Sequence, residues 1–201
     1  MDDDHLFLVR HGESTWNAEH RLQGQLDPPL SNAGRAQAAE LRPLVERLGV
    51  AADRVIVSDL SRARETAALL GLEPGQVDAR WREIDVGEWG GKTAAEVDAE
   101  SGELTNWRGG PRTAPGGETW DEFTARVSDA VDELVAAGGP WLVVCHGGCI
   151  RVAAARLTGA HPLALGSPPN ASLTTFALDG DRPRLLSYGV LPDGGLPTGL
   201  Y

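Results

Sequence analysis

Short apolar runs alternate along the chain with longer segments in which apolar residues recur every three or four positions. The first pattern predicts buried strands, and the second predicts amphipathic helices. Because the two kinds of element alternate, we expect a layered α/β fold, and specifically a three-layer α/β/α sandwich with a mostly parallel central sheet. Strands are predicted at residues 5–10, 54–58, 141–145, 172–178 and 184–188.

Capping residues and glycines mark the ends of four predicted helices. A serine or threonine hydroxyl at a helix start can accept a hydrogen bond from an unpaired backbone N–H group, and glycine commonly ends a helix. The four helices are predicted from Ser31 to about Leu48, from Ser58 or Ser61 to just before Gly71, from Thr119 to about Ala137, and from Gly148 to Gly159.

Glycine and proline are concentrated in segment 87–117, which also contains Trp89 and Trp107. This composition predicts a partly helical lid over the C-terminal edge of the sheet, with an ordinary surface excursion as the alternative. The length of 201 residues fits one domain over residues 1–201. The end of the chain, 192–201, is again rich in glycine and proline and is expected to be a flexible tail.

Two of the predicted strands end in a His-Gly pair. His11 follows strand 5–10 directly, beside Arg10, and His146 follows strand 141–145. The carboxyl ends of parallel strands meet at one edge of a sheet, where ligands bind, so the two imidazoles are expected to lie together. A single histidine in this setting is more often structural. The pair, with glycines and arginines matched to it, favours a catalytic role.

The charge balance restricts the partners. The chain has 29 acidic and 18 basic side chains, a net charge of -11, and a pI near 4.8. Nucleic acid and anionic membranes are therefore excluded as expected partners, and an anionic substrate needs a local cationic pocket. No apolar run reaches the roughly 18 residues that span a bilayer, and the acidic start of the chain argues against a secretory signal. A cytoplasmic location is expected.

Cys145 and Cys149 are the two cysteines of the chain, and three residues separate them. This spacing is not the usual one for a pair of zinc ligands. Because Cys145 ends an apolar strand, buried thiols are expected, with a regulatory disulfide as the alternative. No metal site is predicted.

An ordered series of motifs runs from the first strand to about Leu178. The motifs are Arg10-His11-Gly12-Glu13, Asn17, Gln23-Gly24-Gln25-Leu26-Asp27, Leu30-Ser31, Gly34-Arg35-Ala36-Gln37-Ala38, Ser58-Asp59-Leu60-Ser61-Arg62-Ala63, Glu83 with Gly87, and His146-Gly147. By these motifs the chain resembles the histidine phosphatase superfamily, which includes the cofactor-dependent phosphoglycerate mutases. The resemblance implies a metal-independent phosphomonoester hydrolase without a cofactor, which acts on a small phosphorylated metabolite through a phosphohistidine.

Hydrolysis of a phosphate monoester needs a nucleophile, cations for the phosphate oxygens, and a proton for the leaving oxygen. His11 can attack if its imidazole is neutral, and nearby positive charges lower a histidine pKa. Arg10 and Arg62 are the expected cations, and His146 is expected to donate a hydrogen bond to phosphate. The resemblance assigns these roles to the same positions.

Glu83 is the expected proton carrier, by the resemblance and because Trp81 is near enough to help hold its carboxyl group partly protonated. Glu13 is the alternative, and Asp85 and Glu88 fit less well. Five further residues are expected to contact the phosphate or the group that carries it: Ser14, Asn17, Gln23, Gly24 and Gly147.

Two other functions are open besides the phosphatase. Mutases of this family carry an arginine and a tyrosine shortly after the matching glutamate, whereas this chain continues with Ile84-Asp85-Val86. That departure makes a phosphoglycerate mutase the second choice. A non-catalytic phosphate-binding module is a remote third, because His11 and Glu83 are both present. Whether the chain forms a homodimer is also open.

The segment Gln23-Gly24-Gln25-Leu26-Asp27 is similar to that of family phosphatases that act on glucosyl-3-phosphoglycerate. A sugar phosphate or a phosphoglycerate derivative is therefore the expected substrate. Arginines near the predicted rim offer partners for a carboxylate, and tryptophans offer a surface for a sugar. These are Arg21, Arg82, Arg108 and Arg112, and Trp107 or Trp120, with His20 also placed at the rim.

Overall fold

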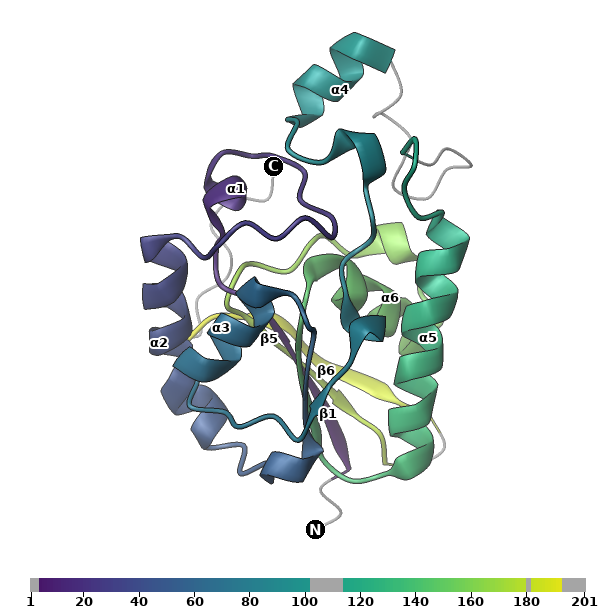
Figure 1. Ribbon diagram of the computed structural model, residues 1–201. Coiled ribbons are helices and arrows are strands. Elements are labelled where there is room, and N and C mark those ends of the chain that lie inside the picture. Colours follow the sequence, from purple (N-terminus) through teal and green to yellow (C-terminus); the bar gives the residue numbers. More distant parts are fainter. Residues whose placement is uncertain (1–3, 102–113, 180–181, 193–201) are drawn as a thin grey trace.

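The computed structural model describes residues 4–101, 114–179 and 182–192. Within these ranges the strands form one sheet in the order β3-β2-β4-β1-β5-β6 (Figure 1). β3, β2, β4 and β1 pair in parallel, whereas β5 is antiparallel to both β1 and β6. The expected mostly parallel sheet is therefore confirmed. Its strands are β1 (His5–Arg10), β2 (Val55–Val57), β3 (Gln76–Val77), β4 (Trp141–Cys145), β5 (Leu173–Ala177) and β6 (Arg184–Val190).

Helices cover both faces of the sheet, as predicted (Figure 1). α2 and α3 lie on one side, and α5 and α6 lie on the other, while α1 and α4 lie beyond the carboxyl ends of the parallel strands. Their bounds are α1 (Thr15–Ala18), α2 (Asn32–Glu46), α3 (Ser61–Leu69), α4 (Ala94–Ser101), α5 (Trp120–Ala137) and α6 (Gly147–Thr158), with short 3-10 helices η1 (Ala52–Arg54), η2 (Ala79–Trp81), η3 (Gly87–Trp89) and η5 (Pro162–Ala164).

Two apolar cores hold the three layers together. Successive residues of a strand point to opposite faces of a sheet. Leu8 of β1 accordingly packs in the core beside α5 and α6, and Val9 packs in the core beside α2 and α3. β4 follows the same alternation, with Val143 in the first core and Val144 in the second. The continuous apolar runs of β1 and β4 thus reflect burial on both faces.

The helix caps were predicted correctly with one exception. Ser31 accepts a hydrogen bond from the third residue of its helix, and Thr119 forms a capping box at the start of α5. Neither Ser58 nor Ser61 caps α3, because the N-cap is Leu60. The Ser58 hydroxyl instead lies 2.9 Å from Nε2 of His146. A residue predicted to stabilise a helix end therefore contacts the candidate catalytic pair.

The segment predicted as a lid lies over the carboxyl edge of the sheet where it is described. η3 and α4 belong to it, so it is partly helical as expected. Residues 102–113, with Trp107, lie outside the described ranges, and so does nearly all of the predicted tail 192–201.

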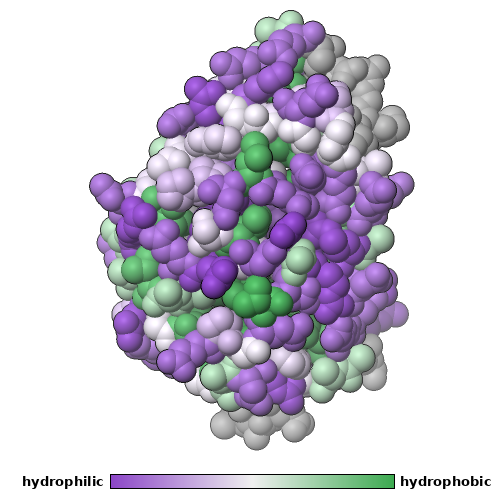
Figure 2. Space-filling view, viewed as in Figure 1, coloured by the Kyte–Doolittle hydropathy of each residue, from purple (hydrophilic) through white to green (hydrophobic). Residues whose placement is uncertain are grey.

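β3 is the described strand that the sequence pattern did not predict. It has two residues at the sheet edge, and Val77 is 51% exposed, so it carries no apolar run. Figure 2 shows that hydrophilic residues cover most of one face of the molecule, with apolar residues in small patches among them. No described helix is long and apolar enough to cross a membrane.

Candidate active site

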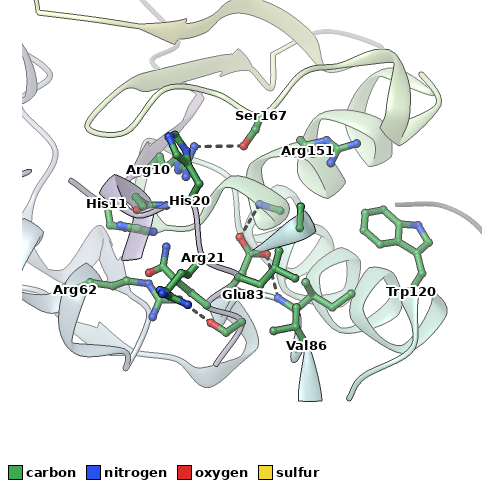
Figure 3. A pocket seen from close by; sticks show the side chains of 17 residues that line it. Arg10, His11, His20, Arg21, Arg62, Glu83, Val86, Trp120, Arg151 and Ser167 are labelled. Carbon is green, nitrogen blue, oxygen red and sulfur yellow. Dashed lines mark hydrogen bonds between the residues drawn. The ribbon is translucent and has the colours of Figure 1, made fainter. Parts of the chain in front are cut away.

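A cavity of about 340 Å³ opens at the carboxyl edge of the parallel strands. In Figure 3, Arg10, His11 and Arg62 lie toward one end of this cavity and Trp120 toward the other, with Glu83 between them. The lining residues come from segments that are far apart in the chain. They are Arg10, His11, Asn17, His20, Arg21, Leu22, Gln23, Gly24, Arg62, Glu83, Ile84, Val86, Ala94, Trp120, Gly148, Arg151 and Ser167.

His11 lies at the floor of the cavity, directly after β1, and its side chain is almost fully buried. Its Nδ1 is 2.7 Å from the carbonyl oxygen of Gly12. Because a carbonyl only accepts, Nδ1 donates this bond, and Nε2 of the neutral ring keeps its lone pair. Burial first, and then the charges of Arg62 and Arg10, hold the pKa of His11 well below its ordinary value. The ring is therefore neutral at neutral pH, which a nucleophile requires.

His146 lies beside His11 at the end of β4. The ring centroids are 5.0 Å apart, and the ring planes are inclined by 58°. Burial is the main cause that lowers the pKa of His146, followed by the charge of Arg62. Its Nε2 is bonded to Ser58, and its Nδ1 is buried without a hydrogen-bond partner among the described residues. The predicted proximity of the two histidines is therefore confirmed. His146 itself is not among the residues that line the cavity.

Arg62 is a nearly buried cation in the first turn of α3, with 1% of its side chain exposed. Its Nη2 donates to the carbonyl of Gly24 at 2.8 Å, and its Nη1 donates to the carbonyl of Leu26 at 2.7 Å. The carboxylate of Asp27 is 3.5 Å away and is itself 36% exposed. A buried charge with such limited compensation is unfavourable unless an anion joins it. The site is therefore suited to a phosphate.

Arg10, the last residue of β1, is anchored on the loop that follows η5. Its Nη1 donates to the carbonyl of Pro168 at 2.6 Å and to the Ser167 hydroxyl at 3.3 Å. A Cβ on Gly147 would lie 2.7 Å from Oγ of Ser167 and 3.4 Å from Nε of Arg10. Gly147 was predicted to bind substrate, but it does not line the cavity. The absence of a side chain at Gly147 leaves room for the Ser167 hydroxyl, to which Arg10 donates.

A hydrogen-bond network orients two amide side chains at the wall of the cavity. The Ser14 hydroxyl donates to Oε1 of Gln23 at 2.8 Å, and the Ser14 N–H group donates to Oδ1 of Asn17 at 3.1 Å. Asn170 also donates to Oδ1 of Asn17, at 3.2 Å. These bonds occupy the amide oxygens, so the NH₂ groups of Asn17 and Gln23 are the ends suited to an anion.

Ser14 itself is fully buried and caps α1. Ser14 does not line the cavity, and its bonds to Asn17 and Gln23 support two residues that do. Gly24 does line the cavity, as expected, and its φ of 53° lies in the left-handed region that favours glycine.

Glu83 reaches into the cavity from the irregular segment between η2 and η3. Its Oε2 accepts from the N–H group of Gly148 at 2.9 Å, and its Oε1 accepts from the N–H group of Ile84 at 3.0 Å. Two backbone donors thus fix the carboxyl group, one of them in the first turn of α6. These donors, rather than the ring of Trp81, are the described partners of the carboxyl group.

The rim arginines mostly have partners already. Arg21 lines the cavity, but it donates to Glu19 at 2.8 Å and to the carbonyl of Gly91 at 2.7 Å. Arg82 forms an ion pair with Asp59 and does not line the cavity. Trp120 and His20 do line it, as predicted. Arg108, Arg112 and Trp107 lie outside the described residues.

Sequence reasoning missed several lining residues. Arg151 lies one turn into α6, buried, with Nε and Nη2 donating to the carbonyls of Leu165 and Pro162. Arg151 could have been found from the sequence, since it lies in the helix that begins directly after His146. Ser167 lies in a loop after η5, and no local pattern marks it. The apolar wall of Leu22, Ile84, Val86 and Ala94 was not predicted either.

Cys145 and Cys149 are free, buried thiols in this structure, so the predicted burial is confirmed. Burial raises the pKa of the Cys149 thiol well above its ordinary value. No group of three or more histidine, cysteine or carboxylate side chains in the described part of the chain is placed to hold a metal ion.

Comparisons with known proteins agree with this geometry. A model of the histidine phosphatase superfamily (branch 1) matches residues 6–190. Glucosyl-3-phosphoglycerate phosphatase of Mycobacterium tuberculosis is 40% identical over 191 residues, which cover 86% of this chain and 84% of that protein. A probable phosphoglycerate mutase, GpmB, of Klebsiella pneumoniae is 38% identical over 160 residues, 72% of each chain.

The fold comparison points the same way. The structure of a mycobacterial glucosyl-3-phosphoglycerate phosphatase with VO3 has a TM-score of 0.78 and 35% sequence identity to this chain, and the match covers 90% of this chain and 96% of that one. The family model spans most of the sequence, and its matched region contains both histidines, Arg10, Arg62 and Glu83. The chain therefore belongs to branch 1 of the histidine phosphatase superfamily.

Proposed function

We propose that this protein hydrolyses a small phosphomonoester without a metal ion, through a phosphohistidine at His11. The observation that carries the proposal is the neutral, buried His11 between two anchored arginines. Its Nδ1 is committed to the carbonyl of Gly12, so Nε2 is the atom that attacks. Arg10 and Arg62 bind the phosphate oxygens, with the NH₂ groups of Asn17 and Gln23.

In the first step, Nε2 of His11 forms a bond to phosphorus while the bond from phosphorus to the ester oxygen breaks. Glu83, protonated at the start of this step, gives its proton to the leaving oxygen. Arg10 and Arg62 stabilise the charge on the three equatorial oxygens. In other enzymes, removal of a single donor of this kind lowers kcat by about 10²–10³-fold. His146 lies next to His11, and its Nδ1, which has no hydrogen-bond partner among the described residues, is the nitrogen that would donate to the same oxygens, while its Nε2 accepts from the Ser58 hydroxyl.

In the second step, water attacks the phosphohistidine. The Glu83 carboxylate takes a proton from this water, the bond between nitrogen and phosphorus breaks, and inorganic phosphate leaves. His11 is then neutral and Glu83 is protonated again, so the cycle closes without any other reactant. A carboxyl group that acts first as acid and then as base fits a site that both the leaving oxygen and water can reach.

The relatives suggest the substrate. Several relatives at 40% identity are phosphatases named for glucosyl-3-phosphoglycerate. An apolar wall that includes Trp120 lines the cavity opposite the arginines, and an aromatic face of this kind suits a sugar. We therefore propose a phosphoglycerate derivative that carries a sugar as the substrate class. Two buried free thiols fit a reducing compartment, which supports the cytoplasm as its location.

The mutase is the second candidate, because GpmB relatives are nearly as similar. Against it, family mutases carry an arginine and a tyrosine shortly after the matching glutamate, whereas this chain has Ile84 and Val86 after Glu83, and both line the cavity. Apolar residues there cannot bind the carboxylate of a small phosphoglycerate.

Two measurements test the proposal. Labelled substrate, mixed rapidly and quenched in alkali, should leave phosphate on His11, and H11A should lose both the label and turnover. Release of labelled inorganic phosphate into water, rather than transfer to an added glycerate, separates the hydrolase from the mutase. A preference of about 10²-fold for one sugar-bearing phosphoglycerate, about 2.7 kcal/mol, supports the substrate class. A flat profile over sugar phosphates and nitrophenyl phosphate refutes it.

A further inference from the structure

An ion pair outside the cavity is hydrogen-bonded to the backbone on both sides of Glu83. Arg126 of α5 and Glu118, just before α5, form a bidentate pair, with Nε to Oε1 at 2.8 Å and Nη2 to Oε2 at 2.7 Å. Their side chains are only 20% and 15% exposed. Most other described ion pairs are far more exposed, such as Arg156 with Asp132 at 52% and 48%.

Both members of the pair also hold the backbone around Glu83. Nη1 of Arg126 donates to the carbonyl of Arg80 at 2.7 Å and to the carbonyl of Arg82 at 3.0 Å. On the other side of Glu83, the N–H group of Asp85 donates to Oε2 of Glu118 at 3.3 Å. The N–H group of Glu118 donates in turn to the carbonyl of Asp85 at 3.0 Å.

These bonds matter because residues 82–86 belong to no helix or strand. In a strand, the ladder of backbone bonds would fix the direction of each side chain. Here Arg126 and Glu118 supply the missing partners, one residue before Glu83 and two after it. The Cys149 thiol adds a further bond to the carbonyl of Arg82 at 3.1 Å.

We infer that Arg126 and Glu118 are positioning residues for proton transfer in this enzyme. They hold the backbone on both sides of Glu83, and so they place its carboxyl group against the leaving oxygen. The inference rests on the proposed role of Glu83 as proton carrier. Neither residue lines the cavity, so neither is expected to touch the substrate.

The test compares R126Q and E118Q with the unaltered protein on two substrates. One is an alkyl phosphate, whose leaving oxygen needs a proton, and the other is nitrophenyl phosphate, whose leaving group does not. The measured quantity is kcat/KM, because it covers the steps up to departure of the leaving group and excludes the later hydrolysis of the phosphohistidine. R156Q is the matched control, since it breaks an exposed bidentate arginine–carboxylate pair that also involves α5, through Asp132.

We expect R126Q to lower kcat/KM for the alkyl phosphate by about 10²-fold, the loss typical of a misplacement of about 1 Å. The loss for nitrophenyl phosphate should be less than about threefold, since acid catalysis contributes little there. E118Q should show the same selectivity with a smaller loss. R126K should recover part of the activity, because one ammonium can reach one carbonyl but cannot pair in a bidentate way. R156Q should leave both substrates unchanged.

The double variant R126Q/E83Q decides whether the effect passes through Glu83. If it does, adding R126Q to E83Q should lower kcat/KM for the alkyl phosphate almost no further. Equal losses on both substrates, full additivity with E83Q, or unchanged activity in both R126Q and E118Q would overturn the inference.

If R126Q does not fold, as thermal unfolding would show, E118Q and R126K carry the same comparison. If E83Q alone shows no selectivity, the proposed role of Glu83 fails together with the inference. If E83Q loses more activity on the alkyl phosphate than on nitrophenyl phosphate, but R126Q and E118Q do not, only the inference is overturned.

Discussion

Replacement of Gly148 by alanine should disable acid catalysis while the protein stays folded. A Cβ at this position would lie 2.0 Å from Oε1 of Glu83 and 3.0 Å from Cζ of Phe123. Ordinary contact begins near 3.4 Å, so the Glu83 carboxyl group must move by more than about 1 Å, a displacement that costs about 10²-fold in rate. The substitution removes no backbone donor, so its effect on Glu83 comes from the displacement of the carboxyl group, which also weakens the 2.9 Å bond from the N–H group of residue 148.

The stability of the variant should change little. The clash falls mainly on the end of a flexible side chain, and alanine in a helix is favoured over glycine by up to about 1 kcal/mol. We therefore expect the free energy of unfolding of G148A to lie within about 1 kcal/mol of that of the unaltered protein. Its kcat/KM should fall by about 10²-fold for an alkyl phosphate, and by much less for nitrophenyl phosphate.

G166A is the matched control for G148A. Gly166 precedes Ser167 at the same cavity, and a Cβ there would meet nothing within 4 Å among the described residues. It should keep its activity on both substrates. If G148A retains full activity on the alkyl phosphate, or loses both substrates equally, the carboxyl group of Glu83 is not the proton donor in the position described here.

Two further predictions concern the buried charges. The folded-state pKa values of His11 and His146 lie well below the ordinary 6.5, so as pH falls below 6.5 the unfolded chain binds protons that the folded chain does not. The contribution of each histidine to the free energy of unfolding, measured with urea, should therefore be complete above about pH 6.5 and decrease as the pH falls below it, by at most about 1.4 kcal/mol per pH unit. An unchanged slope in H146Q would contradict the assignment. Activity should survive exhaustive chelation, because arginines already supply the positive charge; loss of activity that zinc or magnesium restores would refute this.

The parts of the site that a local pattern marks were predictable. Each histidine follows an apolar run and precedes a glycine, and strand pairing then brings the two ends together. β1 and β4 pair with Arg10 opposite Cys145, so the residues that follow, His11 and His146, must be neighbours. The caps of α2 and α5 were predictable for the same reason, since a serine or threonine satisfies a donor within its own turn.

Residues that act through distant contacts were not predictable. Arg126 lies on the polar side of an amphipathic helix, where an arginine is ordinarily a solvated charge. Its partners, the carbonyls of Arg80 and Arg82, are more than forty positions away along the chain. Ser58 was assigned to a cap because it stands before a helix, yet its hydroxyl contacts His146, which follows another strand. Tertiary contacts decided both cases.

The distribution of arginine partners explains how a chain of net charge -11 can attract a dianion. On the surface, arginines pair with carboxylates, as Arg42 does with Glu46 at 2.7 Å. The opposite charges of such a pair cancel each other, and what remains of their field is screened beyond about 10 Å at moderate salt. In the cavity, the two shortest hydrogen bonds of Arg62 go to neutral carbonyls, and the carboxylate of Asp27 is 3.5 Å away, so the buried charge of Arg62 is only partly compensated. The same charge that draws in the phosphate, together with burial, holds His11 neutral. Anion binding and nucleophile activation therefore share one cause, and a variant such as R62Q should weaken both together.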